Sequence, residues 1–347
     1  MAKKDNSGPL DYGALCRRLK AEGTKSVYLL YGAEDYLLSD FVSRVRKECV
    51  SDGAEDFNAK RMDGAAPDPD ALSDAVNMMP FLGGRTFIEL RGMDVGQCRD
   101  DKYLEIFRDI PEWCTVCILA PAEKKPDARL LLTKEIAKHG EIVEFTALPD
   151  TALFPWIVRR FEAHGKTITR REIERLTFLS GNLMTQLIPE IDKICAYVPG
   201  EKITLQDVET LAHHLPEADA FAFTECLSNR NYDGAARLVT ELLESDHNAI
   251  EIFGALGWQL RQLYGLKLAE HLHRGSAAAG EALGLYSYRL RRFADTAHSF
   301  SLKGLSSALR MCAEYDYKLK TSSGEDLEIL KDFMVRFIME ERCAANS

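Results

Sequence analysis

Short apolar runs alternate with segments of helical periodicity over residues 10–146. The runs are rich in β-branched and aromatic residues, which favour buried strands. They predict strands over Val27–Tyr31, Thr86–Leu90, Thr115–Ala120 and Ile142–Phe145. The segments between them predict helices over Leu37–Cys49, Asp70–Met79, Lys102–Ile110 and Ala128–His139. This alternation indicates an α/β domain with a mainly parallel sheet.

The strand pattern ends near the segment TALPD at residues 146–150, and only helical patterns follow. Residues 151–212 predict short helices, with Thr169 as one N-cap and with Thr204 and Asp207 at capping-box spacing. Longer helical segments begin at about Pro216 and continue to the end of the chain. We therefore expect an α/β domain over residues 1–148, a small helical domain over 149–214 and a larger helical domain over 215–347.

The composition is that of an ordinary globular protein, with 46% hydrophobic and 28% charged residues over 347 positions. The formal net charge of −10 argues against a protein whose whole surface binds nucleic acid tightly, although it leaves a local basic face open. The N-terminal segment MAKKDNSGPLDYG has no apolar stretch behind its lysines, and no run approaches the roughly 20 apolar residues that span a bilayer. We therefore expect a cytoplasmic protein with no membrane segment.

The cysteines are scattered, which in a cytosolic chain favours reduced and buried side chains. Cys114 and Cys117 form a C-x-x-C pair, but the pair lies inside an apolar run and has no second pair at zinc spacing. No arrangement of Ser, His and Asp and no pair of carboxylates at catalytic spacing can be argued from the sequence. We expect neither a metal nor a cofactor.

The first strand leads into a turn and a helix, as the strand before a P-loop does in many ATPases. A P-loop has the spacing G-x-x-x-x-G-K-[ST], and its backbone N–H groups and lysine bind phosphate. Gly32 fits the first glycine and Ser39 fits the final hydroxyl residue, but Leu37 and Leu38 replace the second glycine and the lysine. We expect the two leucines to pack as ordinary helix core and the loop to bind no ATP.

Two further requirements of ATP chemistry are also unmet. Glu89 lies within its predicted strand and Asp94 lies beyond it, so the adjacent acidic pair that would hold Mg²⁺ is missing. Met184 stands in the segment SGNLMTQL, where an arginine at a helix start would reach back to the nucleotide. The sequence therefore predicts the fold of an ATPase without its chemistry.

The segment PDPDALSDAVNMMPFLGGRTFIEL predicts a helix that stops abruptly. Asp68 is a suitable N-cap and Pro69 suits the first helical position. Leu72, Val76 and Met79 are spaced to share one apolar helix face.

Pro80 ends this helix, and Gly83 and Gly84 permit a tight turn into the next strand. Phe81 and Leu82 are therefore two large apolar residues at a helix-to-strand corner. Two interpretations are open. Both side chains could enter the domain core, or both could project as an apolar anchor for the pocket of a partner.

The segment YSYRLRRFA places Arg289, Arg291 and Arg292 beside Tyr286 and Tyr288. Basic and aromatic residues mixed in this way can hold nucleic acid. We favour a solvated helix face whose arginine stems lie along apolar surface.

The chain resembles the delta subunit of the bacterial DNA polymerase III clamp loader. The matching segments are VYLLYGAEDYLLSD, MMPFLGGRTFIELRG, FLSGNLMTQLIPEIDKICAYV, ITLQDVETL and EYDYKLKTSSGEDLEILKDFM, in the order that the family shows. The resemblance implies an AAA+-like domain with no working ATP site, a helical lid domain and a helical collar domain that joins an AAA+ pentamer. It also implies a non-catalytic subunit that binds the ring-shaped sliding clamp and opens it for loading onto primed DNA.

In this family an apolar pair at the helix-to-strand corner docks into the clamp. Carried over, the pair is Phe81 and Leu82, with Met79 and Pro80 as neighbouring contacts. The implied partners are the sliding clamp (beta), the gamma/tau and delta-prime subunits, and primer–template DNA through the complex. The alternatives are a divergent AAA+ ATPase and a delta-prime type subunit, whose zinc cysteines and Ser-Arg-Cys motif are missing from the sequence.

Overall fold

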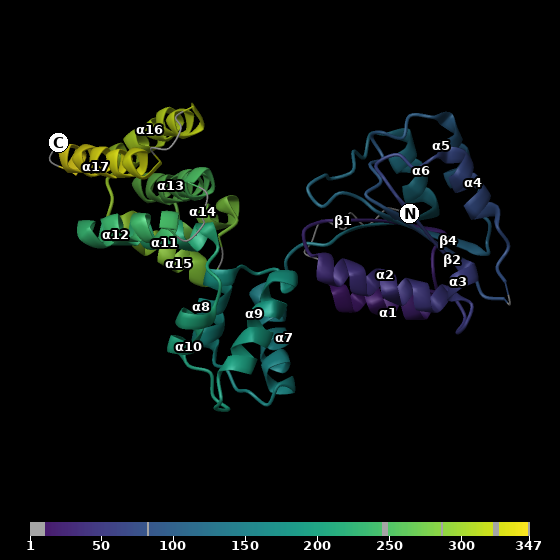
Figure 1. Ribbon diagram of the computed structural model, residues 1–347. Helices are drawn as coiled ribbons and strands as arrows, with labels where there is room; N and C mark the ends of the chain where they lie inside the picture. The colour runs from purple at the N-terminus through teal and green to yellow at the C-terminus, as the bar shows by residue number, and fades with distance from the viewer. Residues whose placement is uncertain (1–10, 82, 245–248, 286, 322–325, 346–347) are drawn as a thin grey trace. The chain divides into compact units, whose positions relative to one another are not determined.

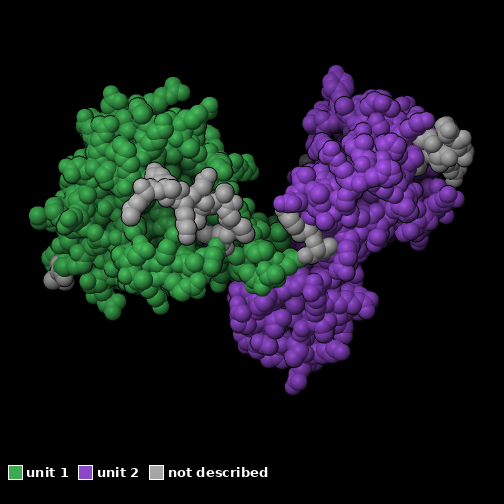
Figure 2. Space-filling view, turned by 180° about the vertical axis from the view of Figure 1, so that it is seen from behind, with its two compact units in different colours: residues 1–153, 182–189 green, residues 154–181, 190–347 purple. Residues whose placement is uncertain are grey.

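The computed structural model describes residues 11–81, 83–244, 249–285, 287–321 and 326–345. The chain divides into two compact units (Figure 2). Unit 1 comprises residues 1–153 and 182–189, and unit 2 comprises residues 154–181 and 190–347. The division into three domains made from the sequence remains a proposal.

Unit 1 contains a five-stranded parallel sheet in the order β2-β3-β4-β1-β5 (Figure 1). The strands are β1 (Val27–Tyr31), β2 (Ala59–Asp63), β3 (Thr86–Arg91), β4 (Cys114–Leu119) and β5 (Gly140–Glu144). The three central strands are almost wholly buried, because helices cover both faces of the sheet. The predicted parallel α/β domain is confirmed.

Helices pack on both faces of this sheet (Figure 1). One face carries α1 (Tyr12–Glu22) and α2 (Asp35–Cys49), and the other carries α4 (Pro69–Asn77), α5 (Asp101–Arg108) and α6 (Leu131–His139). A four-residue helix, α3 (Glu55–Asn58), leads into β2.

The edge strand β2 was not predicted from the sequence. Its five residues, AKRMD, contain one large apolar side chain, Met62, and three of the five are exposed. The strand forms because its backbone pairs with β3, with Ala59 opposite Phe87. Pairing with a distant segment leaves no periodic signal in a short edge strand.

The chain of unit 2 is helical. Helices α7 (Asp150–Ala163) and α9 (Met184–Tyr197) begin in unit 1 and continue into unit 2, which also holds α8 (Arg170–Ser180) and α10 (Leu205–Leu211). The predicted caps are present: the backbone N–H of Thr169 donates to Glu172 at 3.1 Å, and that of Thr204 donates to Asp207 at 2.8 Å. These bonds satisfy N–H groups that have no partner within a helix.

The longer helices follow. They are α11 (Pro216–Ser228), α12 (Tyr232–Glu244), α13 (Ala249–His271), α14 (Ser276–Leu283), α15 (Ser287–His298), α16 (Leu302–Thr321) and α17 (Asp326–Ala345). The longest, α13, packs against α11, α14, α15, α16 and α17. Within the described residues, no helix combines the length and the apolar character needed to cross a membrane.

Candidate functional site

Helix α4 has a well-defined start and an early end. The carboxylate of Asp68 accepts hydrogen bonds from the backbone N–H groups of Asp70 and Ala71, each at 3.4 Å. Met78 then leaves the helix with ψ at 124°, and its carbonyl oxygen accepts a hydrogen bond from Thr86 Oγ1 at 2.9 Å. This bond joins the end of α4 to the start of β3.

The early end of α4 changes the position of Met79. Leu72 and Val76 are buried as expected, but Met79 lies outside the helix and is 73% exposed. The prediction that Met79 shares the buried helix face is wrong, because the chain becomes extended one residue before it. Pro80, which follows, is half-buried.

The buried side chain of Asn58, in α3, holds the corner between α4 and β3. Asn58 Nδ2 donates to the carbonyl oxygens of Phe81 at 2.9 Å and Gly83 at 3.2 Å, and Oδ1 accepts from the N–H of Phe81 at 2.6 Å. Asn58 is fully buried. One amide side chain therefore satisfies both backbone groups of Phe81, as a paired strand would.

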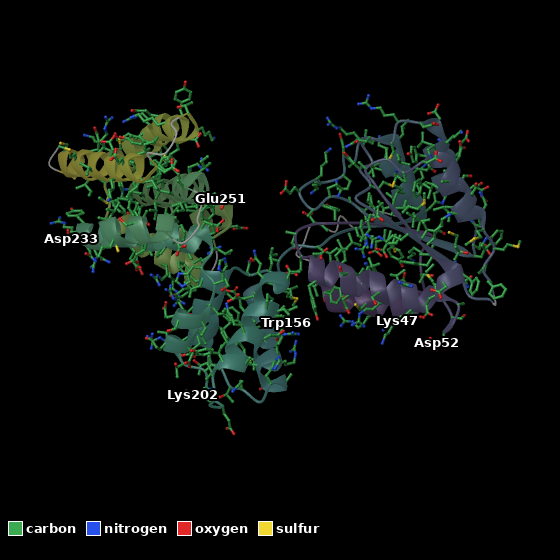
Figure 3. All side chains as sticks on the ribbon, in the orientation of Figure 1. Lys47, Asp52, Trp156, Lys202, Asp233 and Glu251 are labelled. Atoms are coloured by element: carbon green, nitrogen blue, oxygen red, sulfur yellow. The ribbon has the colours of Figure 1, made fainter. Side chains whose placement is uncertain are left out.

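The two glycines of the corner have positive φ angles, 86° at Gly83 and 77° at Gly84. A side chain at Gly84 would also lie 2.9 Å from the carbonyl oxygen of Cys49. The glycines therefore allow the corner to turn tightly against the end of α2. Figure 3 shows Asp52, in the segment that leads from α2 to α3, at this end of unit 1.

Four large apolar side chains are exposed together here, and we call them the apolar corner: Phe57, Met78, Met79 and Phe81. Their exposed fractions are 58%, 38%, 73% and 51% in that order. The rings of Phe57 and Phe81 are in contact, with 4.9 Å between their centroids. The interpretation that places Phe81 in the core is therefore wrong. Leu82, the other residue of the predicted pair, lies outside the described residues.

The turn after β1 is closed by the chain itself. Gly32 has φ at 124°, and a side chain there would overlap the carbonyl oxygen of Phe145. That carbonyl accepts from the N–H of Glu34 at 3.0 Å, while the N–H of Phe145 donates to Tyr31 at 2.7 Å. Gly32 therefore serves the close approach of the residue after β5.

Glu34 follows this turn as the N-cap residue of α2. It is fully buried, and its Oε2 accepts the N–H of Met184, the first residue of α9, at 3.1 Å. Its Oε1 has no hydrogen-bond partner within the described residues. Burial raises the pKa of the Glu34 carboxyl above its ordinary value, and the N–H of Met184 opposes that shift. Met184 is itself buried.

Leu37 and Leu38 are buried at 5% and 4% exposure, so their predicted role as helix core is confirmed. Ser39 is exposed on α2. The two positions that would supply a P-loop glycine and lysine therefore carry core side chains, and a carboxyl group occupies the turn.

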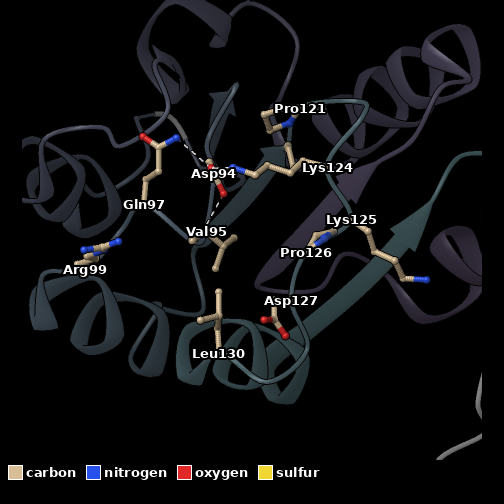
Figure 4. A pocket seen from close by; sticks show the side chains of 12 residues that line it. Asp94, Val95, Gln97, Arg99, Pro121, Lys124, Lys125, Pro126, Asp127 and Leu130 are labelled. Atoms are coloured by element: carbon tan, nitrogen blue, oxygen red, sulfur yellow. Dashed lines mark hydrogen bonds and ion pairs between the residues drawn. The ribbon is translucent and has the colours of Figure 1, made fainter. Parts of the chain in front are cut away.

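A cleft of about 300 Å³ lies between the loops that follow β3 and β4 (Figure 4). Asp94 lies in this cleft and pairs with Lys124 at 2.5 Å and with Gln97 at 3.0 Å. The Lys124 ammonium holds the pKa of the Asp94 carboxyl below its usual range. Glu89 is buried within β3 and pairs with Arg91. The two carboxylates thus have separate partners and do not form an adjacent acidic pair.

The cysteine pair lies inside β4. Cys114 and Cys117 are fully buried, and burial raises the pKa of the Cys114 thiol to about 12. Burial raises the pKa of the Cys117 thiol as well, so the neutral thiol is favoured at both positions. Their predicted role as small buried side chains is confirmed. No cluster of His, Cys, Asp and Glu suited to a metal ion is present in the part of the chain that the structure describes.

The predicted solvated face of the YSYRLRRFA segment is wrong for Arg292. Its side chain is 24% exposed, and its guanidinium lies 5.2 Å from the ring centroid of Phe178 and 5.0 Å from that of Phe221. Arg291 is 67% exposed, as expected for a solvated face. Arg292 therefore packs among aromatic rings within unit 2. Tyr286 lies outside the described residues.

Sequence reasoning missed Phe57 and Asn58, which complete the corner from another segment. The signal available was weak: a Phe-Asn pair after the acidic stretch SDGAED. It also missed that Phe145 approaches Gly32. Both relations join residues far apart in the chain, and no local pattern reports them.

The fold and the site together define a class of protein. An AAA+-like domain with a parallel sheet is followed by helical domains, the turn after the first strand is filled by side chains, and an apolar corner is exposed. This class is that of AAA+-like proteins, in which a parallel-sheet domain is joined to helical domains.

Comparison with known proteins identifies the family. Residues 28–146 match the family model described as DNA polymerase III, delta subunit, and residues 217–337 match that of its C-terminal domain. The chain is 27% identical to the DNA polymerase III subunit delta of Bacillus subtilis over 333 residues, covering 93% of this chain and 95% of the relative. It is 20% identical to the probable DNA polymerase III subunit delta of Aquifex aeolicus, covering 91% and 92%.

Among solved structures, the chain is similar to the Bacillus subtilis DNA clamp loader delta protein. The TM-score is 0.58 at 25% identity, and the match covers 94% of this chain and 99% of that one. The chain belongs to the DNA polymerase III delta subunit family, whose members are clamp-loader proteins of DNA replication.

Proposed function

We propose that this chain binds the sliding clamp through the apolar corner and opens the clamp ring for loading onto primed DNA. The observation that carries the proposal is the exposure of Phe81 and Met79 on a hydrogen-bonded frame, in a chain of the delta family. A cluster of large apolar side chains exposed to solvent is typical of an interaction surface. Pro80, half-buried between Met79 and Phe81, belongs to the proposed contact, and Leu82 belongs to it from the sequence alone.

Opening the ring needs no covalent chemistry by this chain. A surface that binds the strained, open clamp interface more tightly than the closed one shifts the ring toward the open state. The size of the shift is limited by the difference between the two affinities. A stiff corner serves this purpose, because an anchor that is already ordered loses little conformational entropy on binding.

The chain itself acts without ATP chemistry in this proposal. Support comes from Leu37 and Leu38 in the core, from the closed turn at Gly32 and from the buried carboxyl of Glu34. A carboxyl group and a closed turn both oppose a triphosphate. ATP is then held by the gamma/tau partners, beside a delta-prime subunit, and primer–template DNA is reached through the assembled complex.

The test is binding of the purified chain to the sliding clamp of its own organism, with the variant Phe81→Ala. An anchor residue at the centre of an interface contributes about 2 kcal/mol or more, so we expect the variant to bind roughly 30-fold more weakly. Leu131→Ala is the matched control, since Leu131 is 67% exposed in the same unit but lies on α6, outside the corner.

Equal binding by wild type and Phe81→Ala would remove Phe81 from the interface. Absence of clamp binding by the wild type would overturn the proposed function. A nucleotide titration of the wild type tests the remaining alternative, because saturable ATP binding would indicate a divergent ATPase.

A further inference from the structure

Phe57 lies outside the helix-to-strand segment, yet it extends the same exposed surface. Its ring centroid is 4.9 Å from that of Phe81, the two ring planes meet at 40°, and Phe57 is 58% exposed. The two rings are thus in contact, and about half or more of each side chain remains in water. Of the large apolar side chains exposed in the described part of unit 1, more than half belong to the apolar corner.

The surface that Phe57 and Phe81 leave in water raises the free energy of the folded chain. The contact between the two rings does not remove this cost. Apolar surface in water costs about 25 cal/mol for each Å² that could be buried. Aromatic side chains supply large, rigid contact area, and for that reason they are enriched at the centres of interfaces. The second ring doubles the aromatic surface that the corner presents to a partner.

Asn58 follows Phe57 in the chain, and its side chain forms hydrogen bonds with the backbone of the corner. Both atoms of its amide group are engaged with the backbone of Phe81 and Gly83, across 23 and 25 positions of sequence. The residue is fully buried, so these bonds are shielded from competition by water. The same short helix therefore supplies one exposed ring and one buried amide that orients the other ring.

We propose that the clamp-docking surface is built from two segments, with Phe57 as a second aromatic contact for the sliding clamp and Asn58 as the positioning residue for Phe81. This inference rests on the proposed function and names further residues of that site. The partner pocket must accommodate two adjacent phenyl rings with the methionines of the apolar corner beside them. Asn58 touches no partner atom and acts through the backbone of Phe81.

The role of Phe57 is tested with Phe57→Ala in the clamp-binding assay, with Leu131→Ala as the control. We expect binding about tenfold weaker or more for Phe57→Ala and unchanged binding for Leu131→Ala. Phe57 could instead only support the ring of Phe81. A double-mutant cycle with Phe81→Leu, a variant that retains an apolar anchor, separates the two cases.

If Phe57 contacts the clamp directly, Phe57→Ala weakens binding about threefold or more in the Phe81→Leu background as well. If Phe57→Ala causes no further loss of clamp affinity in the Phe81→Leu background, the direct contact is refuted. If Phe57→Ala binds as tightly as the wild type, the second aromatic contact is refuted altogether.

The role of Asn58 is tested with Asn58→Asp and Asn58→Ser. Aspartate retains an acceptor for the N–H of Phe81 but loses both donor bonds, and serine is too short to reproduce the three bonds. We expect about tenfold weaker clamp binding by folded protein for both variants, and faster hydrogen exchange at the Phe81 amide for Asn58→Ser, which loses the bond from that N–H. Urea unfolding measured in parallel gives the folded fraction of each variant, so that the affinity refers to folded molecules.

A merely structural Asn58 would lower the free energy of unfolding and leave the clamp affinity of the folded protein unchanged. That result would refute the positioning role. In the Phe81→Ala background the substitutions at Asn58 should have little further effect, because the residue acts through Phe81. Wild-type binding that Phe81→Ala weakens, with no loss at Phe57 or Asn58, would retain the proposed function and overturn this inference alone.

Discussion

The turn after β1 and the corner after α4 lie in the same unit. Large side chains are buried near the turn and exposed at the corner. At the turn and the start of α2, Glu34, Leu37 and Leu38 are all buried, and the backbone of Phe145 closes the turn. At the corner, Phe81 and Met79 extend into water. The AAA+-like fold thus has core side chains where a P-loop has its second glycine and lysine, and it presents apolar surface at another place.

In the proposed function, the residues that stabilise the fold and the residues that bind the partner lie in different places. Residues at the turn lose exposed surface during folding, so changes there should alter the free energy of unfolding. Exposed residues at the corner contribute little to folding and are available to a partner. Four substitutions test this separation, from the largest expected effect to the smallest.

Gly32→Ala should give the largest loss of stability, about 3 kcal/mol or more. The new side chain would overlap the Phe145 carbonyl oxygen at a φ angle of 124° that L-residues rarely adopt, and both overpacking and backbone strain add to the cost. The measurement is urea unfolding. Gly53→Ala is the control: φ is 81° and nothing lies within 4 Å, so only about 1 kcal/mol is expected. Similar losses for both variants would show that the turn is not closed by Phe145.

Leu38→Ala should lower the free energy of unfolding by about 3 kcal/mol, the range for a leucine removed from a core. Clamp binding by the folded variant should not change, because Leu38 is 4% exposed and lies outside the corner. Urea unfolding and the clamp-binding assay give the two quantities. Weakened clamp binding by folded Leu38→Ala would break the separation between the two regions.

Glu34→Gln should become more stable relative to the wild type as the pH rises. The folded protein raises the pKa of the Glu34 carboxyl, so above the unfolded pKa, near 4.3, the unfolded chain releases this proton more readily than the folded one. The stability that the wild type has below that pH is lost as the pH rises through the folded pKa. Urea midpoints of both proteins from pH 4 to pH 8 measure the change, and a constant difference would contradict it.

Phe81→Ala should have the smallest effect on folding, less than about 1 kcal/mol, because about half of the side chain is already in water. The same variant is expected to bind the clamp roughly 30-fold more weakly. Phe81→Ala should therefore affect binding more than folding, whereas Leu38→Ala should affect folding and leave binding unchanged. Urea unfolding of the variant without the clamp measures the first effect. A loss as large as that of Leu38→Ala would show that Phe81 has a core role.

Much of the fold follows from local pattern. The central strands β1, β3 and β4 are buried on both faces and therefore read as apolar runs that begin within one residue of their predicted starts. Asp68 and Thr204 cap helices because a short polar side chain can reach an N–H group only a few positions away. The replacements at Leu37 and Leu38 also needed no structure, since the P-loop spacing is contiguous.

The relations that the structure added are long-range. β2 forms only because β3 offers a paired edge, and Met79 leaves the buried face because α4 ends two residues early. Whether a large apolar side chain enters a core depends on what surrounds it. The sequence therefore did not decide whether Phe81 is buried or exposed.

The sequence by itself determined the domain class, the loss of the P-loop residues and the position of the corner, because each of these depends on neighbours within about one helical turn. Tertiary structure alone decided that Phe81 is exposed, that Phe57 lies against it and that Asn58 holds its backbone. These contacts join α3 to a segment more than 20 residues away. A contact of that kind is set by the paths of β2 and β3 through the sheet, and it leaves no periodic trace in the residues that make it.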